Sequence, residues 1–155
     1  MKIVAFFGSI YGSYLFRSLK AASLDDLNLV AFNGHRALTQ PDKVDLALKE
    51  ADLLFIYEAG EGFSSILAET LMSWPEAIPF VRLGHDAADF GGNVSPLVLA
   101  KANLYLTEGG PENGPNFWRF LVALASGSPE KAPSPQKLPR VALWHPAAPR
   151  PYYQN

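Results

Sequence analysis

The chain of 155 residues contains no cysteine. This absence excludes disulfide bonds, thiolate zinc sites and catalysis by a thiol. Charge is also scarce, with 18% charged residues and a formal net charge of −2. Such a balance offers no basic field for nucleic acid, so we predict no nucleic-acid partner. Long hydrophobic runs are missing too, and we predict no membrane span.

The N-terminal run MKIVAFFGSIYGSYL has one lysine before an apolar stretch, as a signal peptide would. Gly8, Ser9 and Gly12 interrupt that stretch, and no convincing small-residue cleavage site follows. A first β-strand explains the run better, and we expect a cytoplasmic protein. The length and the 48% apolar content fit one globular domain with a core of its own.

Short apolar runs alternate with segments of helical periodicity along the first 126 residues. The runs predict strands at residues 2–7, 27–32, 52–57 and 78–83, and Pro79 favours an edge or entry position for the last. The periodic segments predict helices at residues 11–22, from Thr39 and Pro41 through 48, at 63–74, at 95–108 and at 117–125, with a polar loop at 84–93. This alternation predicts an α/β fold: a single three-layer domain with a mostly parallel, doubly wound sheet, flavodoxin-like or Rossmann-like.

The character of the chain changes after this domain. Residues 127–155 contain seven of the thirteen prolines, and proline continues neither a helix nor a central strand. We therefore divide the chain into an α/β domain (1–126) and a proline-rich linker with the start of a following domain (127–155). Residues 141–144 allow one short strand there.

The turn after the first strand, residues 8–13, directs backbone N–H groups at the place of an anion. Ser9, Ser13 and Tyr11 of this turn can contact an anion, and Ser9 and Ser13 are its candidate ligand-binding residues. The turn lacks the third glycine of the dinucleotide motif and the lysine of a P-loop. A strand–helix turn eased by glycine is the simpler alternative.

The loop after the fourth strand contains His85, Asp86 and Asp89, which we add to the candidate ligand-binding residues. One imidazole and two carboxylates can bind a divalent metal or relay protons. No second ligand cluster is visible, so we assign no metal site, and capping within the loop is the simpler alternative. His145 is a further, isolated candidate. Glu58 and Glu61 follow the third strand as paired acids or as solvated loop charges.

The stretch from residue 102 to 120 has the most specific pattern of the chain. A helix-like run ends at Glu108, Gly109, Gly110 and Pro111 interrupt it, and an aromatic helix is expected to restart near Pro115. We expect Glu112 and Asn113 to cap and brace this elbow. The aromatic residues Phe117, Trp118 and Phe120 cannot all face one side of a helix, which predicts an apolar docking face.

The segments 102–106, 108–113 and 117–121 resemble the N-terminal region of the cobaltochelatase large subunit, the CobN family, a relative of the magnesium chelatase H subunit. In that family a strand and an acidic loop precede the helix that ends in the GGPEN elbow; here these are residues 79–83 and 84–89. A helix with the motif Arg-Phe-Leu, a proline-rich linker and an aromatic-His-Pro segment follow, matching residues 119–121, 129–139 and 144–146.

Members of that family bind a tetrapyrrole and, with separate ATPase subunits, insert cobalt into a corrin or magnesium into protoporphyrin. The resemblance implies that this chain is the N-terminal, mainly architectural module of an ATP-dependent cobaltochelatase-type subunit of cobalamin biosynthesis, inactive and without cofactor by itself. Its implied partners are later domains of the same subunit, the ATPase subunits and the tetrapyrrole substrate. No catalytic residue is carried over. The alternative is a stand-alone flavodoxin-like domain that binds a mononucleotide or another small anion.

Overall fold

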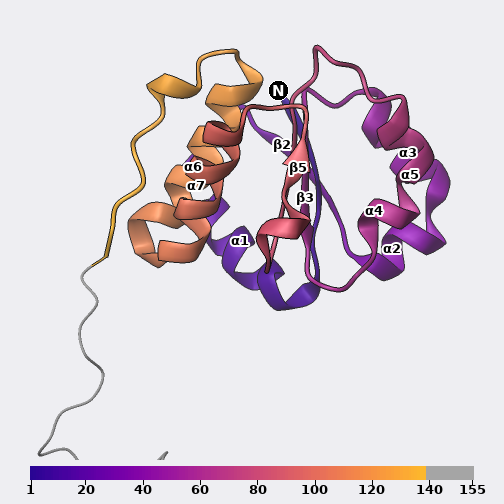
Figure 1. Cartoon of the computed structure of the whole chain (residues 1–155), viewed down its shortest axis with the longest axis horizontal. Coiled ribbons are helices and arrows are strands. Elements are labelled where there is room, and N and C mark those ends of the chain that lie inside the picture. The colour runs from indigo at the N-terminus through magenta and orange to yellow at the C-terminus, as the bar shows by residue number, and fades with distance from the viewer. Residues whose placement is uncertain (139–155) are drawn as a thin grey trace, which may run out of the picture.

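The computed structural model describes residues 1–138. The short strand expected at 141–144 and the candidate His145 lie outside the described residues. Five strands form one sheet in the order β2-β1-β3-β4-β5 (Figure 1). They are β1 (Lys2–Phe6), β2 (Asn28–Phe32), β3 (Leu53–Glu58), β4 (Phe80–Gly84) and β5 (Gly91–Gly92). The first four are parallel and β5 is antiparallel to β4, so the predicted α/β fold is confirmed with flavodoxin-like topology.

Helices cover both faces of this sheet (Figure 1). One face carries α1 (Ser9–Ala22), α6 (Pro96–Glu108) and α7 (Gly110–Ala125), and the other carries α2 (Gly34–Thr39), α3 (Pro41–Lys49), α4 (Phe63–Ile66) and α5 (Ala68–Met72). Two 3-10 turns, η1 (Ala87–Asp89) and η2 (Pro129–Lys131), complete the described elements. No helix among residues 1–138 is long and apolar enough to cross a membrane.

The two cores follow from the alternation of side chains along the strands. In β1, Ile3 and Ala5 belong to the core under α1, α6 and α7, whereas Val4 and Phe6 belong to the core under α2–α5. The central strand β3 is buried over its whole length. Near-continuous apolar runs such as LLFIY are therefore required, because a parallel sheet covered on both faces has no solvent side.

The expected helix at residues 63–74 is wrong as a single element. It is divided into α4 and α5 at Leu67, which ends the first and precedes the second with φ −100° and ψ 11°. Phe63 and Leu67 are both buried in the second core. Uniform helical periodicity in the sequence does not show such a bend.

Two elements escaped prediction. Helix α2 was not predicted; its N-cap is Asn33, which lies directly after β2 and whose side chain accepts a hydrogen bond from the Arg36 backbone N–H at 2.8 Å. Strand β5 consists of Gly91 and Gly92, residues without strand propensity, and it lies inside the expected loop.

The elbow is tighter than expected. Helix α7 begins at Gly110, so that Gly109 alone separates it from α6, with φ +60°. Pro111 lies in the first turn, where its missing N–H costs nothing, and Pro115 lies inside the helix. The expected restart near Pro115 is therefore wrong, and the residues Pro111, Glu112 and Asn113 are helical.

The expected docking face on the aromatic helix is also wrong. Phe117, Trp118, Phe120 and Leu121 are all fully buried, because α7 packs against the sheet, α1 and α6 at once. The Trp118 indole N–H donates to the Leu15 carbonyl oxygen at 2.9 Å. The ring of Phe117 packs against Phe55 of β3, and that of Phe120 against Tyr105 of α6.

A small residue allows α1 and α7 to approach closely. A Cβ atom on Gly114 would lie 2.2 Å from Ser18 Oγ and 2.9 Å from the Tyr14 hydroxyl oxygen. By contrast, a Cβ atom on Gly12 of α1 would meet only the Phe7 ring at 3.6 Å. Substituting alanine for these two helical glycines should therefore change the stability of the fold in opposite directions.

We expect Gly114→Ala to lower the free energy of unfolding by about 1–3 kcal/mol through overpacking. We expect Gly12→Ala to raise it by roughly 0.5–1 kcal/mol, since alanine is the better helix former and finds room. Urea unfolding followed by circular dichroism measures both. Equal effects of the two substitutions would contradict the close α1–α7 contact.

Candidate functional site

The carboxyl ends of the parallel strands form the edge at which ligands bind in open α/β sheets. The chain leaves β1 for β2 on one side, while β3 pairs with β1 on the other, so the crevice lies between the ends of β1 and β3. Three rings meet there: Tyr11 from α1, Tyr57 from β3 and His85 after β4. The Tyr11 and Tyr57 centroids lie 4.4 Å apart, and the His85 ring lies 5.8 and 6.0 Å from them.

The Tyr57 hydroxyl is the most perturbed group of this edge. Burial raises its pKa well above the usual value, and the hydrogen bond and charge of Tyr11, with the charge of Asp89, raise it further. Tyr57 is thus a neutral hydroxyl at physiological pH and supplies a donor rather than a negative charge. Sequence reasoning named Tyr11 only as an anion contact of the first turn and missed Tyr57, for which the position at the end of a strand was the available signal.

The candidates Ser9 and Ser13 lie on the first turns of α1 and are exposed. Gly8, the N-cap residue, supplies no side-chain cap. Ser9 lines a cleft of about 110 Å³ together with Phe7 and with residues of α1, β2 and α2. Ligand sites usually measure roughly 300–1,000 Å³, so this cleft is too small for a mononucleotide.

A carboxylate already lies in the crevice near these serines. A Cβ atom on Gly8 would be 2.2 Å from Glu61 Oε1, and one on Gly34 would be 2.5 Å from Glu61 Oε2. Glu61 therefore lies between the start of α1 and the start of α2, where two helix N-termini favour negative charge. Its charge opposes a bound anion at Ser9.

The loop residues Asp86 and Asp89 form a capping box around η1. Each side chain accepts a hydrogen bond from the other residue's backbone, with Asp86 N donating to Asp89 Oδ2 at 3.2 Å. The capping alternative is therefore confirmed for these two carboxylates. Among residues 1–138, no group of three or more His, Asp or Glu side chains is placed to hold a metal ion.

The paired acids Glu58, the last residue of β3, and Glu61 are separated. Glu58 is only 9% exposed, and its Oε1 accepts hydrogen bonds from the backbone N–H and the hydroxyl of Ser64 at 2.6 and 2.5 Å. The Ser64 hydroxyl in turn accepts a hydrogen bond from Arg82 Nη1 at 3.0 Å. Glu58 thus fixes the start of α4 instead of facing Glu61. Arg82, a charge within an apolar strand, was the sequence signal for this network.

Residues of the elbow bind the segment that follows η2. We call residues 132–138 the C-terminal strap, an extended segment that follows η2. Asn113 is fully buried; its Nδ2 donates to the Gln136 carbonyl oxygen at 2.7 Å, and its Oδ1 accepts from Gln136 N at 2.8 Å. Asn113 therefore pairs with the strap as a neighbouring strand would.

Three further contacts fasten the strap. The Tyr105 hydroxyl donates to the Pro133 carbonyl oxygen, and Leu138 N donates to Glu108 Oε2 at 3.3 Å. A Cβ atom on Gly110 would lie 2.7 Å from Leu138 Cδ1, so the glycine leaves room for that side chain. Glu112 is exposed and has no such role.

Comparison with models of protein families, with curated proteins and with solved structures found no match to this chain.

The position of Glu61 predicts how the strand–helix crevice responds to anions. We expect Glu61→Gln to bind inorganic phosphate at least about fivefold more tightly than the native chain, because two negative charges about 4 Å apart repel by roughly 1 kcal/mol even in water. Amide shifts of Ser9 and Ile10 during a phosphate titration measure the affinity. Glu69→Gln, which removes an exposed carboxylate on α5, serves as the control. Equal phosphate affinity of Glu61→Gln and the native chain would refute the blocking role of Glu61.

Proposed function

We propose that this chain is the N-terminal, mainly architectural module of a cobaltochelatase-type large subunit, which inserts a divalent metal, cobalt in this case, into a corrin-type tetrapyrrole. The proposal rests on the resemblance of residues 102–121 to that family. The observation that carries it is the role of Gly110 and Asn113 of the GGPEN motif, which contact the strap that follows η2.

The residues of the motif have the conformations and side chains that binding of the strap requires. Gly109 and Gly110 both have positive φ, at +60° and +85°, which brings α7 back against α6 within a single residue. Asn113 then presents a donor and an acceptor to the C=O and N–H of one residue, Gln136, a pairing that a side-chain amide completes with both of its polar atoms. The glycines and the asparagine of GGPEN are thus suited to anchoring the strap. A module that is joined to later domains requires such an anchor.

The chemistry of the strand edge supports an architectural role over catalysis. Glu58, Asp86 and Asp89 are engaged in local caps, and the cleft beside Ser9 is far too small for a macrocycle. Metal insertion needs groups that remove the pyrrole protons around an enclosed ring. In this proposal later domains supply those groups, and separate ATPase subunits supply the energy.

Asn113 gives the sharpest structural test of the anchoring role. We expect Asn113→Ala to lower the free energy of unfolding by about 1–3 kcal/mol, because two hydrogen bonds are lost and the Gln136 peptide is left unpaired. We also expect trypsin to cut after Lys137 faster, since the strap is released. Glu112→Ala, at the exposed neighbouring position, should stay within roughly 0.5 kcal/mol of the native chain. Equal effects of both substitutions would remove the anchoring role.

The proposed function itself is tested by activity. We expect the 155-residue chain to insert no cobalt into a corrin, with or without ATP and the ATPase subunits, when absorbance of the corrin is followed. Metal insertion by this chain alone would overturn the architectural role. Reading the gene past the codon for Asn155 tests the family: a long continuing frame supports it, and an immediate stop codon favours an independent anion-binding domain.

A further inference from the structure

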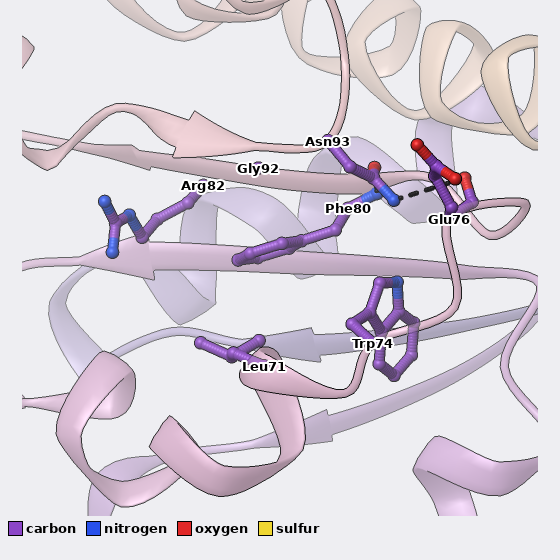
Figure 2. A pocket seen from close by; sticks show the side chains of 7 residues that line it. All are labelled: Leu71, Trp74, Glu76, Phe80, Arg82, Gly92 and Asn93. Carbon is purple, nitrogen blue, oxygen red and sulfur yellow. Dashed lines mark hydrogen bonds between the residues drawn. The ribbon is translucent and has the colours of Figure 1, made fainter.

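A cleft of about 510 Å³ lies beside β4, between that strand and the end of α5 (Figure 2). Its walls combine apolar and polar side chains: Leu71, Trp74, Phe80, Glu76, Arg82 and Asn93. We propose that this cleft binds a small molecule that carries one carboxylate on a flat apolar body. The volume is in the usual range for such ligands, and the site is separate from the strap and from the proposed function.

Arg82 is a cation with unmet hydrogen-bonding capacity. Its Nη1 donates to Ser64 Oγ at 3.0 Å, but its Nε is buried without a partner. Within residues 1–138, the ion pair that the structure contains is Lys2 with Glu50, and no carboxylate pairs with Arg82. Its link to a carboxylate is indirect, through the Ser64 hydroxyl to Glu58, and a partly desolvated guanidinium without a direct carboxylate partner is costly. An anion from outside would relieve that cost, and the planar guanidinium fork matches a carboxylate.

Strand β5 keeps the cleft open because it has no side chains. Gly91 pairs with Arg82 across the sheet, and a Cβ atom there would lie 2.8 Å from Arg82 Nη2. A Cβ atom on Gly92 would lie 2.0 Å from the Phe80 carbonyl oxygen. The two glycines thus allow β5 to lie close to β4, and Gly91 leaves room for the guanidinium. Phe80 lines the cleft although it is only 8% exposed.

The walls are held in place before any ligand arrives. The Trp74 indole N–H donates to the Ile78 carbonyl oxygen at 2.9 Å. Asn93 Oδ1 accepts from Phe80 N at 2.7 Å, and its Nδ2 donates to the same Ile78 oxygen at 2.9 Å. Such fixed walls reduce the ordering cost of binding, and the rings of Trp74 and Phe80 suit a flat apolar body.

Charge in the cleft selects the number of carboxylates. Figure 2 shows Glu76 at the opposite end from Arg82, with the Phe80 side chain between them. Glu76 is exposed, and its negative charge repels a second acidic group on the ligand. One carboxylate at Arg82, followed by an uncharged body along Phe80 and Trp74, satisfies both ends.

The test is a titration of the full chain with 2-naphthoate, followed by the indole N–H resonance of Trp74 and the backbone amides of β4. We expect a Kd of about 1 mM or tighter for a ligand of this size. The neutral analogue 2-naphthalenemethanol should bind at least about tenfold more weakly, because it lacks the charge-assisted hydrogen bonds.

Two variants that should change the naphthoate affinity in opposite directions make the test specific. Arg82→Gln should weaken naphthoate binding at least about tenfold, and Glu76→Gln should strengthen it roughly two- to fivefold. Arg17→Gln, an exposed arginine on α1, is the matched control and should leave the affinity unchanged. If Arg82→Gln fails to fold, Glu76→Gln decides, since it changes only an exposed side chain.

Four results would overturn the proposal: no shift in the cleft at about 10 mM naphthoate, equal binding of the neutral analogue, an affinity unchanged by Glu76→Gln, or retained affinity in folded Arg82→Gln. Inorganic phosphate binding as tightly as naphthoate would also overturn it, because the cleft would then accept any anion.

Discussion

The complete burial of β3 is the constraint on which the rest of this structure depends. All six residues of the strand are buried, so both of its faces need a helical layer. On one face that layer includes α7, the last helix, whose Phe117 ring packs on Phe55. One face of β3 therefore stays uncovered until α7, which ends at Ala125, packs on it. Small residues at the α1–α7 contact and the one-residue connection after α6 follow from the need to bring α7 onto the sheet.

The layers of the fold were predictable because strong local patterns agree with the final packing. Apolar runs predicted the four parallel strands, and helical periodicity predicted a helix from residue 95, where Ser95 Oγ accepts from Val98 N. Elements without a local pattern were missed. Strand β5 consists of two glycines that are held only by their partner strand, and the bend at Leu67 serves a core assembled from distant segments. Asn113 was recognised as important, but its partner Gln136 lies 23 residues away, beyond the reach of local rules.

Sequence patterns were equally limited in identifying which polar side chains of the candidate site are free to bind a ligand. His85, Asp86 and Asp89 were chosen because they follow a strand, and the structure does bring His85 to Tyr11 and Tyr57. Whether a carboxylate caps a turn or faces a ligand depends on one or two hydrogen bonds, which no sequence pattern specifies. Arg82, whose buried Nε has no hydrogen-bond partner, stood in a run chosen for its hydrophobicity. Incompatibility with the local pattern was thus a better indicator of an unusual position than the polar loops were.

The strap has a mechanical consequence. Its contacts to Glu108, Gly110 and Asn113 lie at the junction of α6 and α7, whereas the covalent chain leaves α7 at Ala125, at the helix's other end. Tension applied to the chain beyond Leu138 therefore loads the α6–α7 junction first and reaches the end of α7 only after the strap has detached. A force exerted on the chain by a neighbour would therefore act on the strap contacts near Gly109 before it acts on the core. The strap thus protects the sheet from mechanical load.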